Sequence, residues 1–303
     1  MTESLQAAGE GGMSNARLLA LTALTMVAFA GNSLLCRMAL EHTTVDPASF
    51  TTIRIVSGAL TLRLIVLSRR SKRTEDAGSW LSAFALIAYA AGFSFAYVSL
   101  TAASGALMLF VAVQATMIGY GLWRGERFRP LQIVGLVLAL GGLVGLLLPG
   151  LSAPPLHGSI LMLGAGVAWG IYSLRGTGAS DPLVTTAGNF LRAVPVAGLL
   201  SVLMLSEASL DSAGFWYAVS SGALASGIGY AFWYTVLPAL KSTEAATVQL
   251  SVPVIAAVGG IVFVGEPITL RLVLASVAIL GGIALVIQKQ EAKASSLEST
   301  EVP

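Results

Sequence analysis

The sequence contains little charge. Asp, Glu, Lys and Arg make up 11% of its 303 residues, whereas a soluble domain carries about 25%. Hydrophobic residues make up 55%, so the chain cannot cover a water-facing surface and is expected to lie in lipid. The net charge of +2 is too small to indicate a nucleic-acid partner. The composition predicts an all-α integral membrane protein in contact with membrane lipid.

Cysteine and histidine are scarce as well. Cys36 is the single cysteine, which excludes an intrachain disulfide framework and a cysteine-based metal cluster. We expect it to be a small apolar packing residue. His42 and His157 both fall near the ends of apolar runs. The sequence predicts neither a metal nor another cofactor.

Carboxylates are missing from the middle of every apolar run. All 15 Asp and Glu residues fall in tails, in loops or near the ends of these runs. Groups that relay protons inside a membrane are usually Asp, Glu or His. The sequence therefore argues against a proton relay built from a buried carboxylate.

Between two polar tails, residues 1–16 and 288–303, the apolar runs predict ten membrane-spanning helices, because about 20 residues cross the hydrocarbon layer. The expected spans are Leu18–Leu40, Pro47–Leu67, two within Ala77–Trp123 that meet at a turn at Thr101–Gly105, Pro130–Pro149, Gly158–Leu174, Pro182–Leu205, Gly214–Leu240, Thr243–Val264 and Pro267–Ile287. Pro195 is expected to kink the seventh of them.

The chain repeats itself at an offset of 140 residues. Gly125-Glu126, followed by an apolar run and Leu140-Gly141-Gly142, recurs as Gly265-Glu266 and Leu280-Gly281-Gly282. A fixed register of this kind indicates a duplicated unit. We therefore predict two five-helix repeats at residues 17–149 and 157–287. Five spans per unit is an odd number, so the two repeats are expected to be inverted relative to each other.

The basic residues predict the orientation in the membrane. With the N-terminus in the cytoplasm, the cytoplasmic side collects twelve Lys and Arg residues and the outer side two, Arg37 and Arg271. The twelve are Arg17, Arg69, Arg70, Lys72, Arg73, Arg124, Arg127, Arg129, Arg175, Lys241, Lys289 and Lys293. Both termini are therefore predicted to be cytoplasmic, in a multi-pass protein of the inner membrane.

Ten spans, two inverted halves and a Gly-Glu pair before the last helix of each half resemble the drug/metabolite transporter superfamily of the EamA type. Within it the chain is similar to amino-acid exporters of the YddG type. The resemblance implies a central cavity lined by the first, third, fourth, sixth, eighth and ninth helices, and rocking of helix pairs to alternate access. Small multidrug members carry a Glu in their first helix where this chain has Asn32. This departure argues against binding of cationic drugs.

Polar and aromatic residues on these helices are the predicted substrate-binding positions. They are Asn32, Tyr89, Phe93, Ser94, Tyr97, Gln114, Trp169, Tyr172, Ser173, Tyr230, Trp233, Tyr234 and Gln249. An amide in mid-membrane is costly unless it faces protein or water, so Asn32 and Gln114 are expected to face inward. The alternative for each residue is an interhelical hydrogen bond.

Other polar residues have two possible roles. Arg192 lies inside a predicted span and is a possible anion contact, while Arg54 and Arg63 are near enough to span ends to snorkel to the interface. Glu126 and Glu266 precede helix starts, where an acidic side chain favours the helix; gating is the alternative. Pro253 is a structural or gating candidate.

The leading hypothesis is a secondary transporter, not an enzyme, that exports small amphipathic metabolites, most of all amino acids including aromatic ones. Its partner is then a small-molecule substrate; the oligomeric state stays open. One alternative is transport of anionic metabolites or sugar phosphates through Arg192. A membrane-embedded enzyme lacks a paired acid and base or an activated nucleophile in this sequence. A receptor-like protein does not account for the duplicated halves.

Overall fold

The computed structural model describes residues 13–69, 78–125, 130–150, 153–177, 179–240, 245 and 248–288, and this part of the chain is helical, without a strand. The elements are α1 (Asn15–His42), α2 (Pro47–Ser68), α3 (Trp80–Tyr97), α4 (Ala102–Trp123), α5 (Pro130–Leu147), α6 (Leu156–Gly176), α7 (Pro182–Leu203), α8 (Ser212–Ser220), α9 (Gly229–Val236), α11 (Ser251–Gly259) and α12 (Leu270–Gln288), with short 3₁₀ segments at Leu205–Glu207 and Leu237–Ala239 and π-helical segments η2 (Ser221–Ile228) and η4 (Gly260–Val264).

Side-chain caps explain where several helices begin. Asp46 accepts hydrogen bonds from the first turn of α2, and Asp181 does the same for α7. In both cases proline occupies the first helical position, where its missing N–H costs nothing. Thr101 caps α4, so the turn between α3 and α4 lies before Thr101. The predicted turn at Thr101–Gly105 is too late in the sequence, because the capping hydroxyl marks the helix start.

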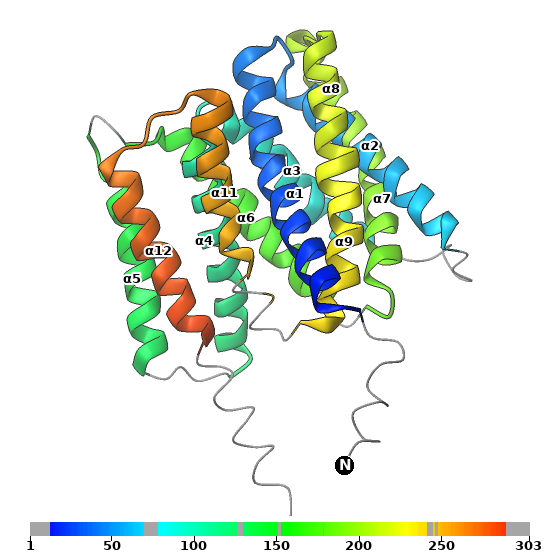
Figure 1. Cartoon of the computed structure of the whole chain (residues 1–303). Helices are drawn as coiled ribbons and strands as arrows, with labels where there is room; N and C mark the ends of the chain where they lie inside the picture. The colour runs from blue at the N-terminus through cyan, green and yellow to red at the C-terminus, as the bar shows by residue number, and fades with distance from the viewer. Residues whose placement is uncertain are drawn as a thin grey trace, which may run out of the picture.

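The helices run back and forth between two ends of a bundle (Figure 1). At one end, Asp46 binds Ser209, and Arg37 binds the carbonyls that close α3. Glu266 lies at this end, which is called the Glu266 end below. At the opposite end, the Ser79 N–H donates to Asn189, and the Arg175 guanidinium donates to Ser82. This second end is called the Arg175 end.

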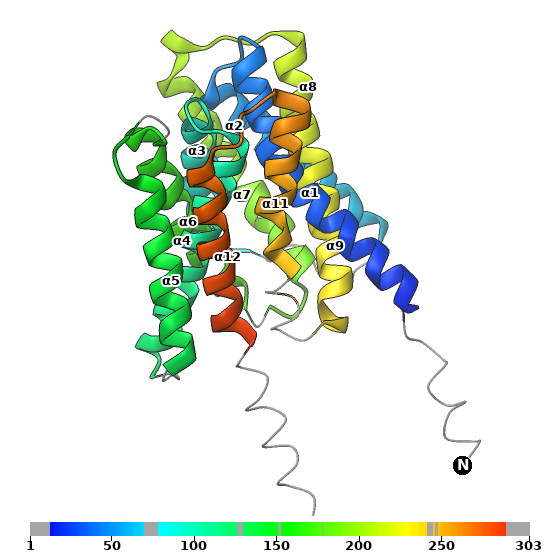
Figure 2. The ribbon, with the colours of Figure 1, turned by 60° about the vertical axis from the view of Figure 1, so that its left-hand side comes forward.

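α5 and α12 pack as a pair at one edge of the bundle (Figures 1 and 2). Their backbones come so close that a Cβ atom at Gly135 would overlap Gly282, and one at Gly282 would overlap Gly135. Small residues allow such an approach in lipid, where packing rather than water drives helix association.

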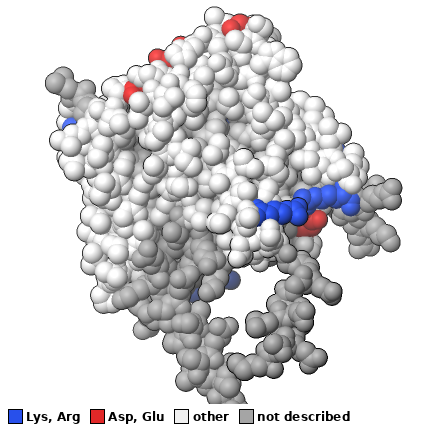
Figure 3. All heavy atoms as spheres, in the orientation of Figure 1, with Lys and Arg blue, Asp and Glu red and all other residues white. Residues whose placement is uncertain are grey.

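Lipid is the expected solvent of the outer surface. Within the part of the chain that the structure describes, six helices are long and apolar enough to cross a membrane: α1, α2, α3, α4, α5 and α7. Large apolar side chains are exposed along the bundle, including Leu64, Val137 and Val277. Figure 3 shows one face on which a broad area carries no Lys, Arg, Asp or Glu. The structure is therefore that of a multi-pass membrane protein.

The eighth and ninth predicted spans are not uniform helices. In place of one helix over Gly214–Leu240, α8 passes through the π-helical segment η2 into α9 and ends in a 3₁₀ turn. In place of Thr243–Val264, the described part holds α11 and the π-helical segment η4. Hydrophobicity, from which the spans were predicted, does not distinguish α from π geometry, because it reports which residues are apolar and not how the backbone hydrogen bonds are arranged. The helix α7 continues through Pro195.

Candidate functional site

A cavity of about 470 Å³ lies in the centre of the bundle. Its walls come from α1, α3, α4, α6, α7 and α9, together with Ala245 and Gln249 before α11. The volume is within the range of about 300–1,000 Å³ that is usual for small-molecule sites. The helices implied by the resemblance contribute to the wall, and α7, which is not among them, contributes as well.

Eleven of the thirteen predicted binding positions line this cavity. They are Asn32, Tyr89, Phe93, Gln114, Trp169, Tyr172, Ser173, Tyr230, Trp233, Tyr234 and Gln249. The structure thus brings together residues that are up to 217 positions apart in the sequence (249 − 32). Their proximity makes them candidates; it does not by itself assign a ligand.

Ser94 and Tyr97 are the two positions that do not line the cavity. Tyr89, Phe93 and Tyr97 follow one another at four-residue spacing on one face of α3, whereas Ser94 points to another side of the helix. The Tyr97 ring packs against Phe93 at 4.7 Å but does not line the cavity. Ser94 accepts a hydrogen bond from Thr51 at 2.8 Å, and Tyr97 donates to the Ala102 carbonyl at 3.3 Å. Both side chains are completely buried, so their role in the structure is packing between helices.

The sequence prediction missed several lining residues. Phe29 and Ser33 lie on α1 beside Asn32, and Phe110 lies one turn before Gln114 on α4. Helical spacing from Asn32 and Gln114 gives the signal that could have found them. Thr185 and Thr186 lie on α7, which is not among the cavity-lining helices that the resemblance implies.

Aromatic rings form a continuous wall around Trp169. The Trp169 ring lies 4.5 Å from Tyr89, 5.4 Å from Tyr172 and 5.8 Å from Tyr230, measured between ring centroids. Tyr230 in turn stacks on Tyr234 at 6.0 Å. Aromatic pairs at such separations stabilise one another, which holds the wall in a defined shape. It offers flat apolar surfaces with hydroxyl groups at their edges.

Asn32 is held by two serines of the π-helical segment η2. The hydroxyls of Ser221 and Ser226 donate to the Asn32 Oδ1 atom at 2.8 and 3.3 Å. In a π-helix residues five apart are hydrogen-bonding neighbours, so η2 presents both serines to the same acceptor. Asn32 is buried and lines the cavity. Its amide orientation is therefore fixed by the helix opposite.

A second polar group spans α6, α7 and α9. Thr186 lies 3.0 Å from the Tyr234 hydroxyl and 3.5 Å from the Tyr172 hydroxyl, which also accepts from Asn189 at 3.4 Å. The Oδ1 atom of Asn189 accepts from the Ser79 N–H at 2.8 Å. This network ties the cavity wall to the start of α3.

The cavity reaches the surface at the Arg175 end. Gly176 and Thr177 line it and are themselves exposed, and Pro182 at the start of α7 lies beside them. Among the described lining residues there is no Asp, Glu or His. A solute entering from this end therefore meets hydroxyl, amide and aromatic groups before it reaches the buried residues Asn32, Tyr89 and Phe93.

The Glu266 end is closed by a charged cluster. Both oxygens of the Glu266 carboxylate accept hydrogen bonds from the Ala102 backbone N–H, at 3.0 and 2.9 Å. The carboxylate also accepts a hydrogen bond from the Arg37 Nε atom at 3.1 Å. Arg37 also donates to the Tyr97 carbonyl at 3.1 Å and pairs with Glu41. The cluster joins α1, the α3–α4 turn and the segment before α12.

Glu266 does not cap the helix that follows it. The prediction that it stabilises the start of α12 is wrong, because its carboxylate lies at the N-terminus of α4, in the other half of the chain. A helix N-terminus attracts a negative charge whichever segment supplies it. Gly265 has a φ of +73° and Gly125 a φ of +92°, which favours glycine at both copies of the motif. Glu126 lies outside the described residues.

Neither Arg192 nor Pro253 lines the cavity. The Arg192 guanidinium donates to the Gly188 carbonyl at 3.2 Å within α7. Pro253 is buried in the first turn of α11, where proline is tolerated. The possible anion contact at Arg192 is thus not part of the cavity.

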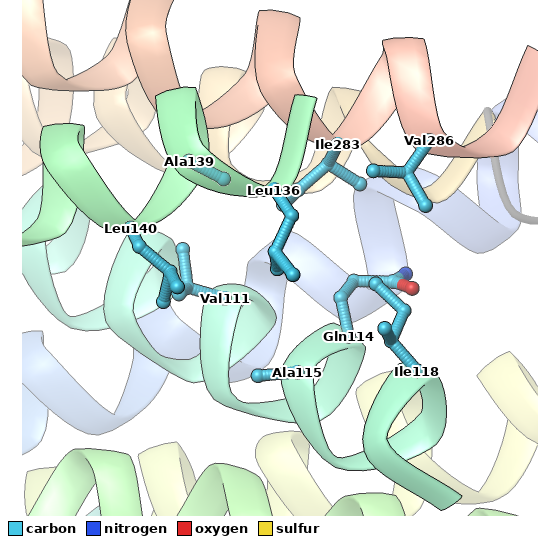
Figure 4. Close-up of a pocket in the computed structure, with 9 residues that line it drawn as sticks. All are labelled: Val111, Gln114, Ala115, Ile118, Leu136, Ala139, Leu140, Ile283 and Val286. Carbon is cyan, nitrogen blue, oxygen red and sulfur yellow. The ribbon is translucent and has the colours of Figure 1, made fainter. Parts of the chain in front are cut away.

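A second, small apolar pocket of about 10 Å³ lies between α4, α5 and α12 (Figure 4). Gln114 reaches its rim beside Ile118 and also lines the central cavity. The small pocket is too small for a metabolite, since it has room for about one water molecule.

A lipid-facing helical bundle around a central cavity that opens at one end is typical of secondary transporters. Comparison with known protein families identifies the family. The chain belongs to the EamA-like transporter family, whose profile matches residues 17–148 and again residues 156–288. The drug/metabolite transporter resemblance is thereby confirmed. The same profile matching twice agrees with the 140-residue repeat.

Individual relatives extend this finding. An uncharacterized protein of Pseudomonas aeruginosa is 53% identical over 93% of this chain and 99% of its own length. The threonine/homoserine exporter RhtA of Escherichia coli is 34% identical over 54% of this chain and 57% of that protein. A solved crystal structure superposes with a TM-score of 0.61 at 20% identity, covering 88% of this chain and 99% of the other, which supports the fold.

Proposed function

We propose that this protein exports small amphipathic metabolites, most of all amino acids including aromatic ones, across the inner membrane by alternating access. The observation that carries the proposal is the central cavity, whose wall combines stacked aromatic rings with amide and hydroxyl groups. Such a wall matches a zwitterion with an apolar side chain. RhtA, an exporter of threonine and homoserine by its name, supports the same substrate class.

Two inverted five-helix repeats with ten spans are part of the proposal. α2 begins at the Glu266 end, where Asp46 binds Ser209, and α7 begins at the Arg175 end, beside the start of α3. The equivalent second helices of the two halves thus run in opposite directions. The count of basic residues supports a cytoplasmic Arg175 end. A reporter that is active only in the periplasm should be silent when fused at Ser295.

In this orientation the cavity opens to the cytoplasm, and the Glu266 end faces outward and is closed. Alternating access then requires the Arg37–Glu266 pair to separate while the Arg175 end closes. Arg37 and Glu266 come from opposite halves of the chain. The pair is therefore positioned to break when the halves move relative to each other.

Counterflow in proteoliposomes tests the proposal. Vesicles loaded with an unlabelled amino acid should take up the labelled one, whereas vesicles loaded with a sugar phosphate or a quaternary amine should not. Because no described lining residue is Asp, Glu or His, an imposed pH gradient should not accelerate uptake. Failure of every amino acid, or uptake driven by sugar phosphate, would refute the proposed substrate class.

A further inference from the structure

Arg54 is a buried cation directly behind the cavity wall. It lies in the interior of α2 with 3% of its surface exposed. Its Nη2 atom donates to the Tyr89 hydroxyl at 2.8 Å, and its guanidinium carbon lies 5.2 Å from the Tyr89 ring centroid and 4.8 Å from that of Phe93. Both rings line the cavity, so a full positive charge is separated from the cavity by a single layer of side chains.

Protein groups do not neutralise this charge within the described residues. The two ion pairs found there both belong to Arg37, and the Nη1 atom of Arg54 is buried without a hydrogen-bond partner. An arginine in a membrane interior is costly and is usually paired. Cation–π contacts with the Tyr89 and Phe93 rings offset only part of the free-energy cost of burying the charge. A buried charge left in this state favours a negative charge nearby.

The hydrogen bond from Arg54 fixes the role of the Tyr89 hydroxyl. Because the oxygen accepts from the guanidinium, the hydroxyl hydrogen is left to donate to another group. A phenol that accepts from a cation is also a stronger donor, since chains of hydrogen bonds polarise one another. Because Tyr89 lines the cavity, this hydrogen is available to an acceptor that binds there.

Asn32 supplies a second donor in the same cavity. Its Oδ1 atom already accepts from Ser221 and Ser226, so the Nδ2 group, which can only donate, is what remains for a ligand. Two donors backed by a buried cation match a group that only accepts hydrogen bonds and carries negative charge. A carboxylate has both properties.

We propose that the deep part of the cavity is a carboxylate subsite in which the Tyr89 hydroxyl and the Asn32 amide bind the substrate carboxylate and Arg54 acts as its buried counter-ion. Arg54 is a positioning residue, because it acts through Tyr89 without contacting the ligand. This inference rests on the proposed function and narrows it to carboxylate-bearing metabolites. Amines, amides and quaternary cations are excluded from the subsite.

Binding of a matched pair of probes tests the subsite independently of transport. Trp169 lies beside Tyr89, so quenching of tryptophan fluorescence in the purified protein reports on occupancy. The probes are 3-phenylpropanoate and its neutral amide, 3-phenylpropanamide, which differ only in the carboxylate. We expect the acid to bind more tightly by about tenfold or more, as for a hydrogen bond to a charged group. Equal binding of acid and amide would overturn the subsite.

Variants assign the preference to residues. Tyr89→Phe removes the hydroxyl with little change in volume, and Arg54→Gln removes the charge. Both should weaken binding of the acid by about tenfold and leave binding of the amide unchanged, a split that a general loss of structure does not produce. Arg54→Lys, which keeps the charge, should retain part of the preference. Full acid preference in Tyr89→Phe refutes the proposal even if Arg54→Gln does not fold.

Arg63→Gln is the matched control. It removes the same charge from the same helix, nine residues or about two and a half turns further along, and Arg63 does not line the cavity. Its preference for the acid should equal that of the wild type. An equal loss in Arg63→Gln and Arg54→Gln would show that net charge, not the subsite, sets the preference.

Transport of paired amino acids separates this inference from the proposed function. Threonine, homoserine and phenylalanine should exchange in counterflow, and their amides should not. Exchange of the amides at the same rate refutes the subsite but leaves the exporter proposal standing. Tight binding of 3-phenylpropanoate that depends on Arg54, without exchange of any amino acid, leaves the subsite standing and refutes the exporter proposal.

Discussion

The two halves of the chain carry related sequences but differ in the regularity of their third and fourth helices. In the first half, α3 and α4 are uninterrupted α-helices of 18 and 22 residues. In the second half, π-helical segments occupy Ser221–Ile228 and Gly260–Val264. π-segments are often found at functional sites. Here η2 holds Asn32, and η4 leads into the loop of Glu266.

Each π-helical segment of the second half contains a glycine at a position where the first half has a larger residue. Gly222 in η2 has Ser82 as its counterpart, and Gly260 in η4 has Tyr120. A Cβ atom at Gly222 would overlap the Arg54 carbonyl, and one at Gly260 would overlap the Glu266 carboxylate. The irregular segments thus lie where a neighbouring group approaches the backbone. Repetition of sequence preserves the helix order but not the local geometry.

Gly222→Ala should produce the largest loss of stability. The added methyl group meets the backbone of α2, which cannot move aside as a side chain can, so we expect destabilisation of about 3 kcal/mol or more. The matched control is Gly119→Ala in α4, where nothing lies near the added atom and alanine favours the helix by up to about 1 kcal/mol. Thermal unfolding in detergent measures both. Equal changes in stability for Gly222→Ala and Gly119→Ala would show that close packing at Gly222 does not distinguish the two halves.

Glu266→Gln should produce the next largest loss. The variant breaks a mostly buried pair with Arg37 and weakens the charge at the start of α4, and we expect a cost of about 2–3 kcal/mol. Substrate preference should change less than stability. Glu41→Gln is the control, because Glu41 pairs with the same arginine but is 40% exposed, which limits its effect to about 0.5 kcal/mol. A changed substrate profile at normal stability would contradict a purely structural role.

The first-half copy of the motif gives the same comparison a second test. Glu126→Gln should also lower yield or thermal stability more than it alters substrate choice, as expected for an acidic residue before a helix start. The measurement is the same unfolding assay, run beside Glu266→Gln. A neutral Glu126→Gln would mean that only the glutamate of the second half contributes to stability.

Asp46→Ala should have a smaller effect, near 1 kcal/mol for a helix cap. Burial opposes ionisation of Asp46, but hydrogen bonds from Ser49, Ser209 and Ala48 outweigh it and lower its pKa. A lowered pKa contributes stability above the unfolded pKa of about 3.9, and this contribution is lost as the pH falls through the folded value. Unfolding of the wild type and Asp46→Ala at neutral and acidic pH should therefore converge in acid.

Asp181→Ala sharpens this result. Asp181 caps α7 as Asp46 caps α2, but Asp46 alone also accepts a hydrogen bond from Ser209 in the other half of the chain. The loss should be smaller for Asp181→Ala. A larger loss would show that the contact with Ser209 contributes nothing.

Arg192→Lys should have the smallest effect. Arg192 does not line the cavity, and the lysine keeps the charge, so expression and counterflow should match the wild type. Lysine cannot reproduce the planar fork of arginine. Loss of binding in a well-folded Arg192→Lys protein would revive the alternative of an anionic cargo at this position.

The order of the helices and most of the cavity-lining residues could be predicted, because the lengths of the apolar runs and the 140-residue repeat can be read directly from the sequence. Asn32 and Gln114 were recognised as inward-facing since an amide is costly in lipid. The partner of Glu266 could not be predicted, because the helix start that it caps belongs to a distant segment. Arg54 was expected to snorkel, and only the packing of α2 against α3 places it behind Tyr89.

The contact between α5 and α12 repeats itself under the 140-residue shift. Gly142 meets Ala275, and Gly282 meets Gly135; adding 140 to 142 and to 135 gives 282 and 275. Reciprocal contact of this kind is the geometry of an isologous dimer interface, here contained in one polypeptide. Each half therefore carries a surface complementary to its own duplicate. We expect residues 17–149 and 157–287 to associate in the membrane when they are expressed as separate chains.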